Sequence, residues 1–162
     1  RKGKEMIKLC RVDHRLLHGQ VAFSWSHALG ADAILIVSDE VASNEVRMKT
    51  MRLAKPVGIK LVIKSVDDSI KAIKSGVTDK YRLLIVTGSI ADAERLVREC
   101  GISSLNLGGT VKSSETTRSF GSAVHLTDEE VEVVSGLVRD GVEVEVRQVA
   151  KDKKVVLSEK DL

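Results

Sequence analysis

Short runs of Val, Ile and Leu alternate along this chain with segments in which apolar residues recur at helical spacing. Runs of this kind are typical of strands that are buried on both faces of a parallel sheet. Five of them occupy residues 6–12, 33–37, 59–63, 83–86 and 104–107. Because predicted strands alternate with predicted helices, we expect an α/β fold with a single doubly wound, predominantly parallel sheet and helices on both faces.

The segments between and after these runs carry weaker signals. Ser43 is predicted to cap the helix that precedes the third strand. Residues 110–122 are polar and predict one irregular stretch, after which Thr127 begins a final helix. Valines alternate with charged residues over 142–146, which predicts a half-exposed strand at a sheet edge. Residues 155–157 predict a short last strand.

Length and composition bound the class of protein. The chain has 162 residues, and we expect residues 1–5 to be a tag remnant or a disordered N-terminus and residues 6–162 to form a single domain. A net charge of +3 and 2% aromatic residues argue against a nucleic-acid partner. Cys10 and Cys100 lie in separate apolar segments and are predicted to be reduced core residues of a cytoplasmic protein.

The sequence carries neither a membrane-spanning nor a secretory signal. No apolar run is long enough to cross a bilayer, and no signal peptide is recognisable. A role in membrane transport would therefore require a separate membrane partner.

The loop between the first predicted strand and the first predicted helix, residues 13–20, holds the candidate site. Its sequence, DHRLLHGQ, supplies one Asp, one Arg and two His at a helix start, where unpaired backbone N–H groups favour an anion. A neutral imidazole such as that of His18 is a nucleophile that can take up a phosphoryl group. Arg15 can direct two N–H donors at phosphoryl oxygens, and Asp13 can orient the ring. By pattern alone, His18 is equally compatible with a structural role.

Two other interpretations of these side chains are weaker. His14 and His18 are four residues apart, which aligns them as metal ligands only within a helix. Arg15 lies between them, and no further Cys or His cluster accompanies them, so no metal is expected. His27 and His125 lie outside any motif and are interpreted as packing or surface residues.

Several motifs together resemble one known family. The loop reads Asp-x-Arg-Leu-x-His-Gly-Gln-Val after an N-terminal strand, which is similar to the active-site loop of the IIB subunits of mannose-type sugar phosphotransferase systems. The likeness continues, in the order of the family, through residues 37–42 (VSDEVA), 46–47 (VR), 105–109 (LNLGG) and 141–147 (GVEVEVR). It spans nearly the whole chain, from Ile7 to Val149.

The resemblance implies roles for the loop residues. His18 falls on the family's phosphorylated position, with the phosphate carried on Nδ1, and Arg15 falls on its phosphate-contacting arginine. Asp13 matches a position that is usually acidic. Gly19 and Gln20, at the helix start, are predicted to contact the phosphate as well.

Three further residues are assigned through the same resemblance. Ser75 lies where a related IIB has a serine that approaches the phosphate. His14 departs from the family, which commonly has Asp or Asn at this position, and it adds potential positive charge beside the site. Together with Arg11, His14 is predicted to dock the partner that delivers the phosphate, because basic groups attract a phosphorylated donor.

The implied activity is that of a phosphoryl-carrier enzyme. His18 would receive phosphate from a phosphohistidine on a IIA domain and pass it to a sugar bound by the membrane subunits IIC and IID. No cofactor is implied, a homo-oligomer is possible, and the chain would associate with the inner face of the cell membrane through IIC and IID. The family covers mannose, fructose, sorbose and N-acetylgalactosamine, and the overall sequence favours the last. The alternative is a non-catalytic doubly wound module that binds a phosphorylated metabolite.

Overall fold

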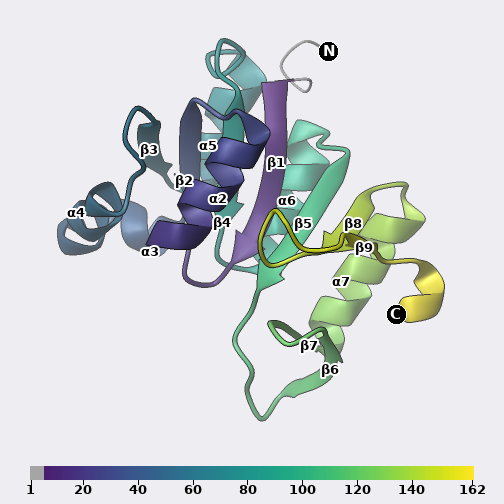
Figure 1. Cartoon of the computed structure of the whole chain (residues 1–162). Helices are drawn as coiled ribbons and strands as arrows, with labels where there is room; N and C mark the ends of the chain where they lie inside the picture. Colours follow the sequence, from purple (N-terminus) through teal and green to yellow (C-terminus); the bar gives the residue numbers. More distant parts are fainter. Residues whose placement is uncertain (1–5) are drawn as a thin grey trace.

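The computed structural model describes residues 6–162, so the prediction for residues 1–5 lies outside the described residues. A seven-stranded sheet runs in the order β3-β2-β4-β1-β5-β8-β9, and neighbouring strands are parallel except β8 and β9 (Figure 1). The strands of this sheet are β1 (Ile7–Asp13), β2 (Ala33–Val37), β3 (Lys60–Lys64), β4 (Leu83–Thr87), β5 (Ser104–Gly109), β8 (Glu143–Val146) and β9 (Val155–Val156). The predicted doubly wound α/β class is confirmed.

Helices cover both faces of the sheet. They are α2 (Gly19–Leu29), α3 (Asp39–Ala42), α4 (Glu45–Leu53), α5 (Val66–Ser75), α6 (Ile90–Cys100), α7 (Asp128–Arg139) and the short 3-10 helix η1 (Glu159–Asp161). Side chains of β2 alternate between the two layers: Ile34 and Ile36 belong to the core cluster that contains residues of α2, α3 and α4, whereas Leu35 belongs to the cluster that contains residues of α5, α6 and α7. Both faces of β2 are thus buried, which explains why its sequence is a continuous apolar run.

Three details differ from the sequence prediction. Asn44, not Ser43, caps α4, and its side chain accepts a hydrogen bond from the backbone N–H of Arg47. The stretch predicted to be irregular contains β6 (Thr116–Phe120), which forms an antiparallel hairpin with β7 (Val124–Thr127). Strand β8 is not at the sheet edge, because β9 pairs with its outer side. The predicted short last strand is β9 itself.

Strand β1 lies at a switch point of the sheet. It is flanked by β4 on one side and β5 on the other. The chain leaves β1 through α2 on one face towards β2, whereas α6 crosses the other face from β4 to β5. Ligands of doubly wound sheets bind outside the carboxyl ends of strands at such a point. The loop that follows β1 begins at this place.

Within residues 6–162, no helix is both long enough and apolar enough to span a bilayer.

Candidate functional site

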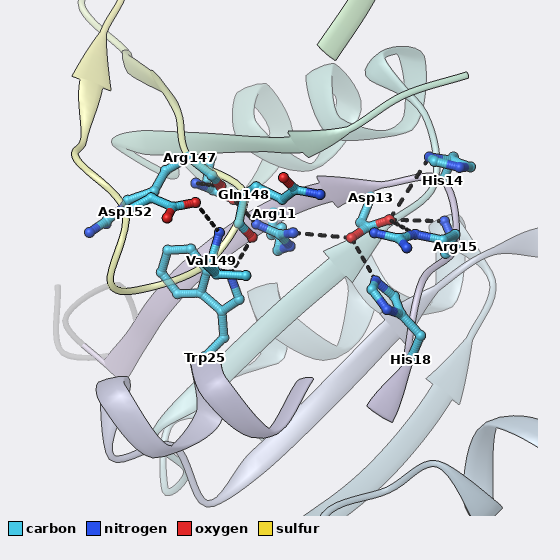
Figure 2. Close-up of polar contacts among 11 residues, drawn as sticks. Arg11, Asp13, His14, Arg15, His18, Trp25, Arg147, Gln148, Val149 and Asp152 are labelled. Atoms are coloured by element: carbon cyan, nitrogen blue, oxygen red, sulfur yellow. Dashed lines mark hydrogen bonds and ion pairs between the residues drawn. The ribbon is translucent and has the colours of Figure 1, made fainter. Parts of the chain in front are cut away.

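The buried carboxylate of Asp13, the last residue of β1, is the centre of the site (Figure 2). Its Oδ2 lies 3.1 Å from Arg11 Nη2 and 3.1 Å from His18 Nε2, and its Oδ1 accepts a 3.0 Å hydrogen bond from the backbone N–H of Arg15. Burial alone would raise the pKa of Asp13. The hydrogen bonds from His18 and Arg15 and the charge of Arg11 outweigh burial, so the pKa is lowered and the carboxylate stays ionised.

Arg11 holds Asp13 from inside the protein. Its side chain is 2% exposed, and Nη1 donates 2.7 Å to Asn106 Oδ1 and 3.0 Å to the carbonyl oxygen of Arg147. Gly108 makes room for it, because a Cβ atom there would overlap the guanidinium. The prediction that Arg11 docks a partner is therefore wrong, because its guanidinium is buried and hydrogen-bonded to groups inside the protein.

The loop after β1 turns sharply back towards Asp13. The backbone N–H of Leu16 donates 2.8 Å to the carbonyl oxygen of Asp13, and Leu16 has a left-handed φ of 59°. A non-glycine residue in this conformation costs about 1–2 kcal/mol. Burial of Leu16 (7% exposed) and Leu17 (4% exposed) in the core beneath α2 offsets this cost. Two apolar anchors thus fix the backbone that carries the polar side chains.

His18 stands at the start of α2 and has one ring nitrogen engaged. It is the N-cap residue, and its side chain is 25% exposed. A carboxylate can only accept, so Nε2 carries the proton that is shared with Asp13. Nδ1 then keeps its lone pair, and within residues 6–162 no hydrogen bond to it is found. The geometry presents Nδ1 as a nucleophile of fixed tautomer, which the sequence-based assignment to Nδ1 requires.

Positive groups surround the space in front of His18. Its side chain does not cap α2, so the backbone N–H groups of the first turn, including Gly19 and Gln20, lack an intrahelical partner. A Cβ atom on Gly19 would meet nothing within 4 Å. Arg15 is 45% exposed, and its Nε lies 3.6 Å from Asp13, so the guanidinium can turn towards an anion at the helix start. This arrangement can bind a phosphoryl group next to a nucleophile.

The structure brings most of the predicted residues together but not all of them. His14 lies at the rim, 36% exposed, with Nδ1 4.0 Å from Asp13. Ser75 lies at the end of α5, which starts at the carboxyl edge of the sheet and ends near its amino edge. Its hydroxyl donates 2.8 Å to the carbonyl oxygen of Ala72. Ser75 therefore lies outside the site.

Sequence reasoning missed the support behind the loop. Trp25 of α2 is 1% exposed, and its Nε1 donates 3.1 Å to the carbonyl oxygen of Gln148. The guanidinium carbons of Arg11 and Arg147 lie 5.3 Å and 4.8 Å from the centroid of the Trp25 ring (Figure 2). These contacts tie α2, which starts directly after His18, to the segment after β8. An arginine two residues before an aspartate in an apolar predicted strand was the only local signal.

A doubly wound sheet whose first helix starts at a histidine held by a buried carboxylate, with an exposed arginine beside it, is an arrangement that can accept a phosphoryl group. Comparison with known proteins gives the particular family. Residues 7–160 match the model of the PTS system sorbose subfamily IIB component. The chain belongs to this family, as the sequence resemblance predicted.

Two relatives and two solved structures illustrate the range of similarity. A probable phosphotransferase enzyme IIB component from Streptococcus pyogenes serotype M6 is 40% identical over 94 residues, 58% of each chain. The mannose-specific EIIAB component of the PTS system of Escherichia coli K12 is 34% identical over 152 residues, 93% of this chain and 46% of that protein. The chain thus spans about half the length of these two relatives.

Both solved structures share the whole fold. The IIBSor domain of the sorbose permease from Klebsiella pneumoniae superposes with a TM-score of 0.84 at 30% identity, covering 92% of this chain and 91% of that one. The N-acetylgalactosamine-specific IIB component 1 from Escherichia coli gives 0.84 at 25% identity, covering 93% and 99%.

Proposed function

We propose that this chain is a phosphoryl carrier of a sugar phosphotransferase system and that His18 is its phosphorylated residue. The observation that carries the proposal is the free Nδ1 of a histidine whose Nε2 is held by Asp13 at 3.1 Å. The lone pair of Nδ1 attacks the phosphorus of a phosphohistidine on a IIA domain. The donor N–P bond breaks, and its electron pair returns to the donor imidazole. The group then passes to a sugar hydroxyl, whose proton is released.

Each neighbouring group has a definite part in this transfer. As the N–P bond forms, positive charge develops on the ring of His18, and the ionised Asp13 stabilises it through the Nε2 proton. Arg15 and the first turn of α2 balance the charge that spreads over the phosphoryl oxygens. No cofactor takes part, because the N–P bond of the donor supplies the free energy.

The partners follow from the same proposal. A IIA domain delivers the group, and the membrane subunits IIC and IID hold the sugar, so the chain works at the inner face of the cell membrane. His14 and Arg15 are exposed around His18 and offer basic contacts to a phosphorylated donor. Formation of a homo-oligomer stays a prediction.

The acceptor sugar is a narrower proposal. The similar proteins carry the names mannose, sorbose and N-acetylgalactosamine, and we retain N-acetylgalactosamine, which the sequence favours, as the candidate. Membranes that contain the cognate IIC and IID subunits should accept phosphate from labelled chain onto that sugar. Transfer to mannose or sorbose alone would identify that sugar, and not N-acetylgalactosamine, as the acceptor.

The nucleophile is tested with phosphorylated IIA. The wild-type chain should gain one phosphate by intact mass, as an acid-labile and base-stable label. His18→Ala should gain none. His27→Ala, which alters an exposed histidine of the same helix, is the matched control and should be labelled at the wild-type rate. Label on His18→Ala would refute the assignment of the nucleophile, and no mass change on any variant would favour the non-covalent binding module.

A further inference from the structure

A cavity of about 310 Å³ lies beside the edge strand β3, away from the loop that follows β1. Its floor comes from Ala33 and Leu35 of β2 and from Val62 of β3, and Ala72 of α5 forms one wall. Leu35 is buried, whereas Val62 is only partly buried. The helices on this face therefore leave β3 incompletely covered, at the end of the sheet opposite β9 (Figure 1).

Lysines line the mouth of this cavity. Lys60 and Lys64 project from β3 on the same side as Val62, because side chains two residues apart share one face of a strand. Lys80 reaches it from the turn before β4. The Nζ atoms of Lys60 and Lys80 lie 5.3 Å and 5.2 Å from the ring centroid of Tyr81. The ammonium group of Lys60 beside the ring lowers the pKa of the Tyr81 hydroxyl.

The positive charge at this mouth is not neutralised. No Asp or Glu is among the residues that line the cavity, and within residues 6–162 none of these three lysines forms an ion pair. Lysines on an edge strand also discourage pairing with other chains. That role does not account for Lys80, which lies outside the strand, or for the apolar hollow below it.

We propose that this cavity binds a small organic anion, with an apolar end in the hollow and its carboxylate or phosphate between Lys60 and Lys80. The volume lies at the lower end of the range of about 300–1,000 Å³ that is typical of ligand pockets, and such pockets combine apolar walls with a few charged groups. Strand β3 is three positions from β1, about 14 Å across the sheet. The ligand would not compete with phosphate at His18, so this inference stands apart from the proposed function.

Amide chemical shifts of the isotope-labelled full chain, followed by NMR during titration, test the proposal. The probes are 4-phenylbutyrate, 4-phenylbutanol and 4-phenylbutylamine, which share one apolar group and differ in charge. The carboxylate should bind at least tenfold more tightly than the alcohol or the amine and should shift the amides of Val62, Ala72 and Tyr81. Equal binding of the acid and the alcohol, or shifts confined to other surfaces, would overturn the proposal.

Variants separate local from general electrostatics. Lys60→Gln/Lys80→Gln should lower the affinity for 4-phenylbutyrate at least fivefold. Lys49→Gln/Lys153→Gln removes the same charge from exposed positions elsewhere and should change it less than twofold. Ala72→Leu, which fills the wall of the cavity, should abolish binding while phosphorylation of His18 proceeds as in the wild type. Undiminished affinity in Lys60→Gln/Lys80→Gln would exclude these lysines as the anion contact.

Discussion

Replacing Gly108 with alanine tests how the interior of the protein holds Asp13. A Cβ atom at this position would overlap the guanidinium of Arg11, which is 2% exposed. The guanidinium would have to move, and its bonds to Asn106 at 2.7 Å, to the Arg147 carbonyl at 3.0 Å and to Asp13 at 3.1 Å would lengthen or break. The side chain is enclosed, so it has no solvated position close at hand.

The loss in the free energy of unfolding can be calculated from these contacts. Breaking a buried ion pair costs about 3–5 kcal/mol. Alanine restricts the unfolded chain more than glycine does, which offsets about 0.4–1 kcal/mol. We therefore expect Gly108→Ala to lower the free energy of unfolding by about 3 kcal/mol. In a domain of this size, that corresponds to a fall in Tm of roughly 6–12 °C.

Urea unfolding of the variant and of two controls measures this effect. Gly109→Ala places its Cβ 3.6 Å from Asp13 Oδ1 and 3.6 Å from His14 Nδ1, which are ordinary contacts, so it should change stability by only about 0.5 kcal/mol. In an Arg11→Met background, Gly108→Ala should cost little, because the overlapping group is gone. Equal stability of the Gly108→Ala and Gly109→Ala proteins, or an undiminished cost in the Arg11→Met background, would refute the reasoning.

Further predictions concern the loop after β1 and the core. Asp13→Asn should slow phosphate uptake from IIA by a factor of about 10²–10⁴, measured by label incorporation, because an amide no longer fixes the tautomer of His18. The lowered pKa of Asp13 stabilises the fold above the unfolded pKa of about 4, and this contribution is lost as pH falls through the folded value. Asp13→Asn should thus lose less stability than the wild type in urea titrations between about pH 5 and pH 2. Arg15→Lys should impair uptake while the free energy of unfolding changes by only about 0.5 kcal/mol, because lysine keeps the charge but loses the planar fork; equal uptake rates would remove Arg15 from the mechanism. His14→Glu should slow association with IIA more at low salt than at high salt, and rates unchanged at every ionic strength would place the docking surface elsewhere. Burial raises the pKa of Cys10 to about 12, so iodoacetamide should not modify it until the protein is unfolded, as mass spectrometry would report.

The local sequence pattern was sufficient to predict most strands of the sheet. It failed for strands whose burial or position in the sheet depends on residues far away in the sequence. The run over residues 33–37 could only be a buried strand, and β2 occupies those residues. The hairpin of β6 and β7 was missed because β6 presents exposed polar side chains such as Arg118, although Val124 and Leu126 of β7 alternate inward. Strand β8 was assigned to an edge because its partner β9 contributes only two residues.

The residues of the candidate site also fall into those that a local motif predicted and those that it did not. His18, Arg15 and Asp13 lie within six residues of sequence, so a short motif captured their grouping. Arg11 was interpreted as a surface cation because its partners Asn106 and Arg147 are 95 and 136 residues away along the chain. Ser75 was placed in the site by resemblance, whereas the direction of α5 carries it towards the other end of the sheet. Burial and topology are properties that a local pattern does not contain.

The position of Trp25 gives this protein a built-in optical reporter. It is the single tryptophan of the chain, and it lies on α2, the helix that starts directly after His18, against the guanidinium groups of Arg11 and Arg147. An enclosed indole emits at shorter wavelength than a solvated one, and cations near its ring alter the emission. Any change at Asp13 that moves Arg11 would therefore alter the intrinsic fluorescence. Arrival and departure of a phosphoryl group could be followed in real time on the unlabelled chain.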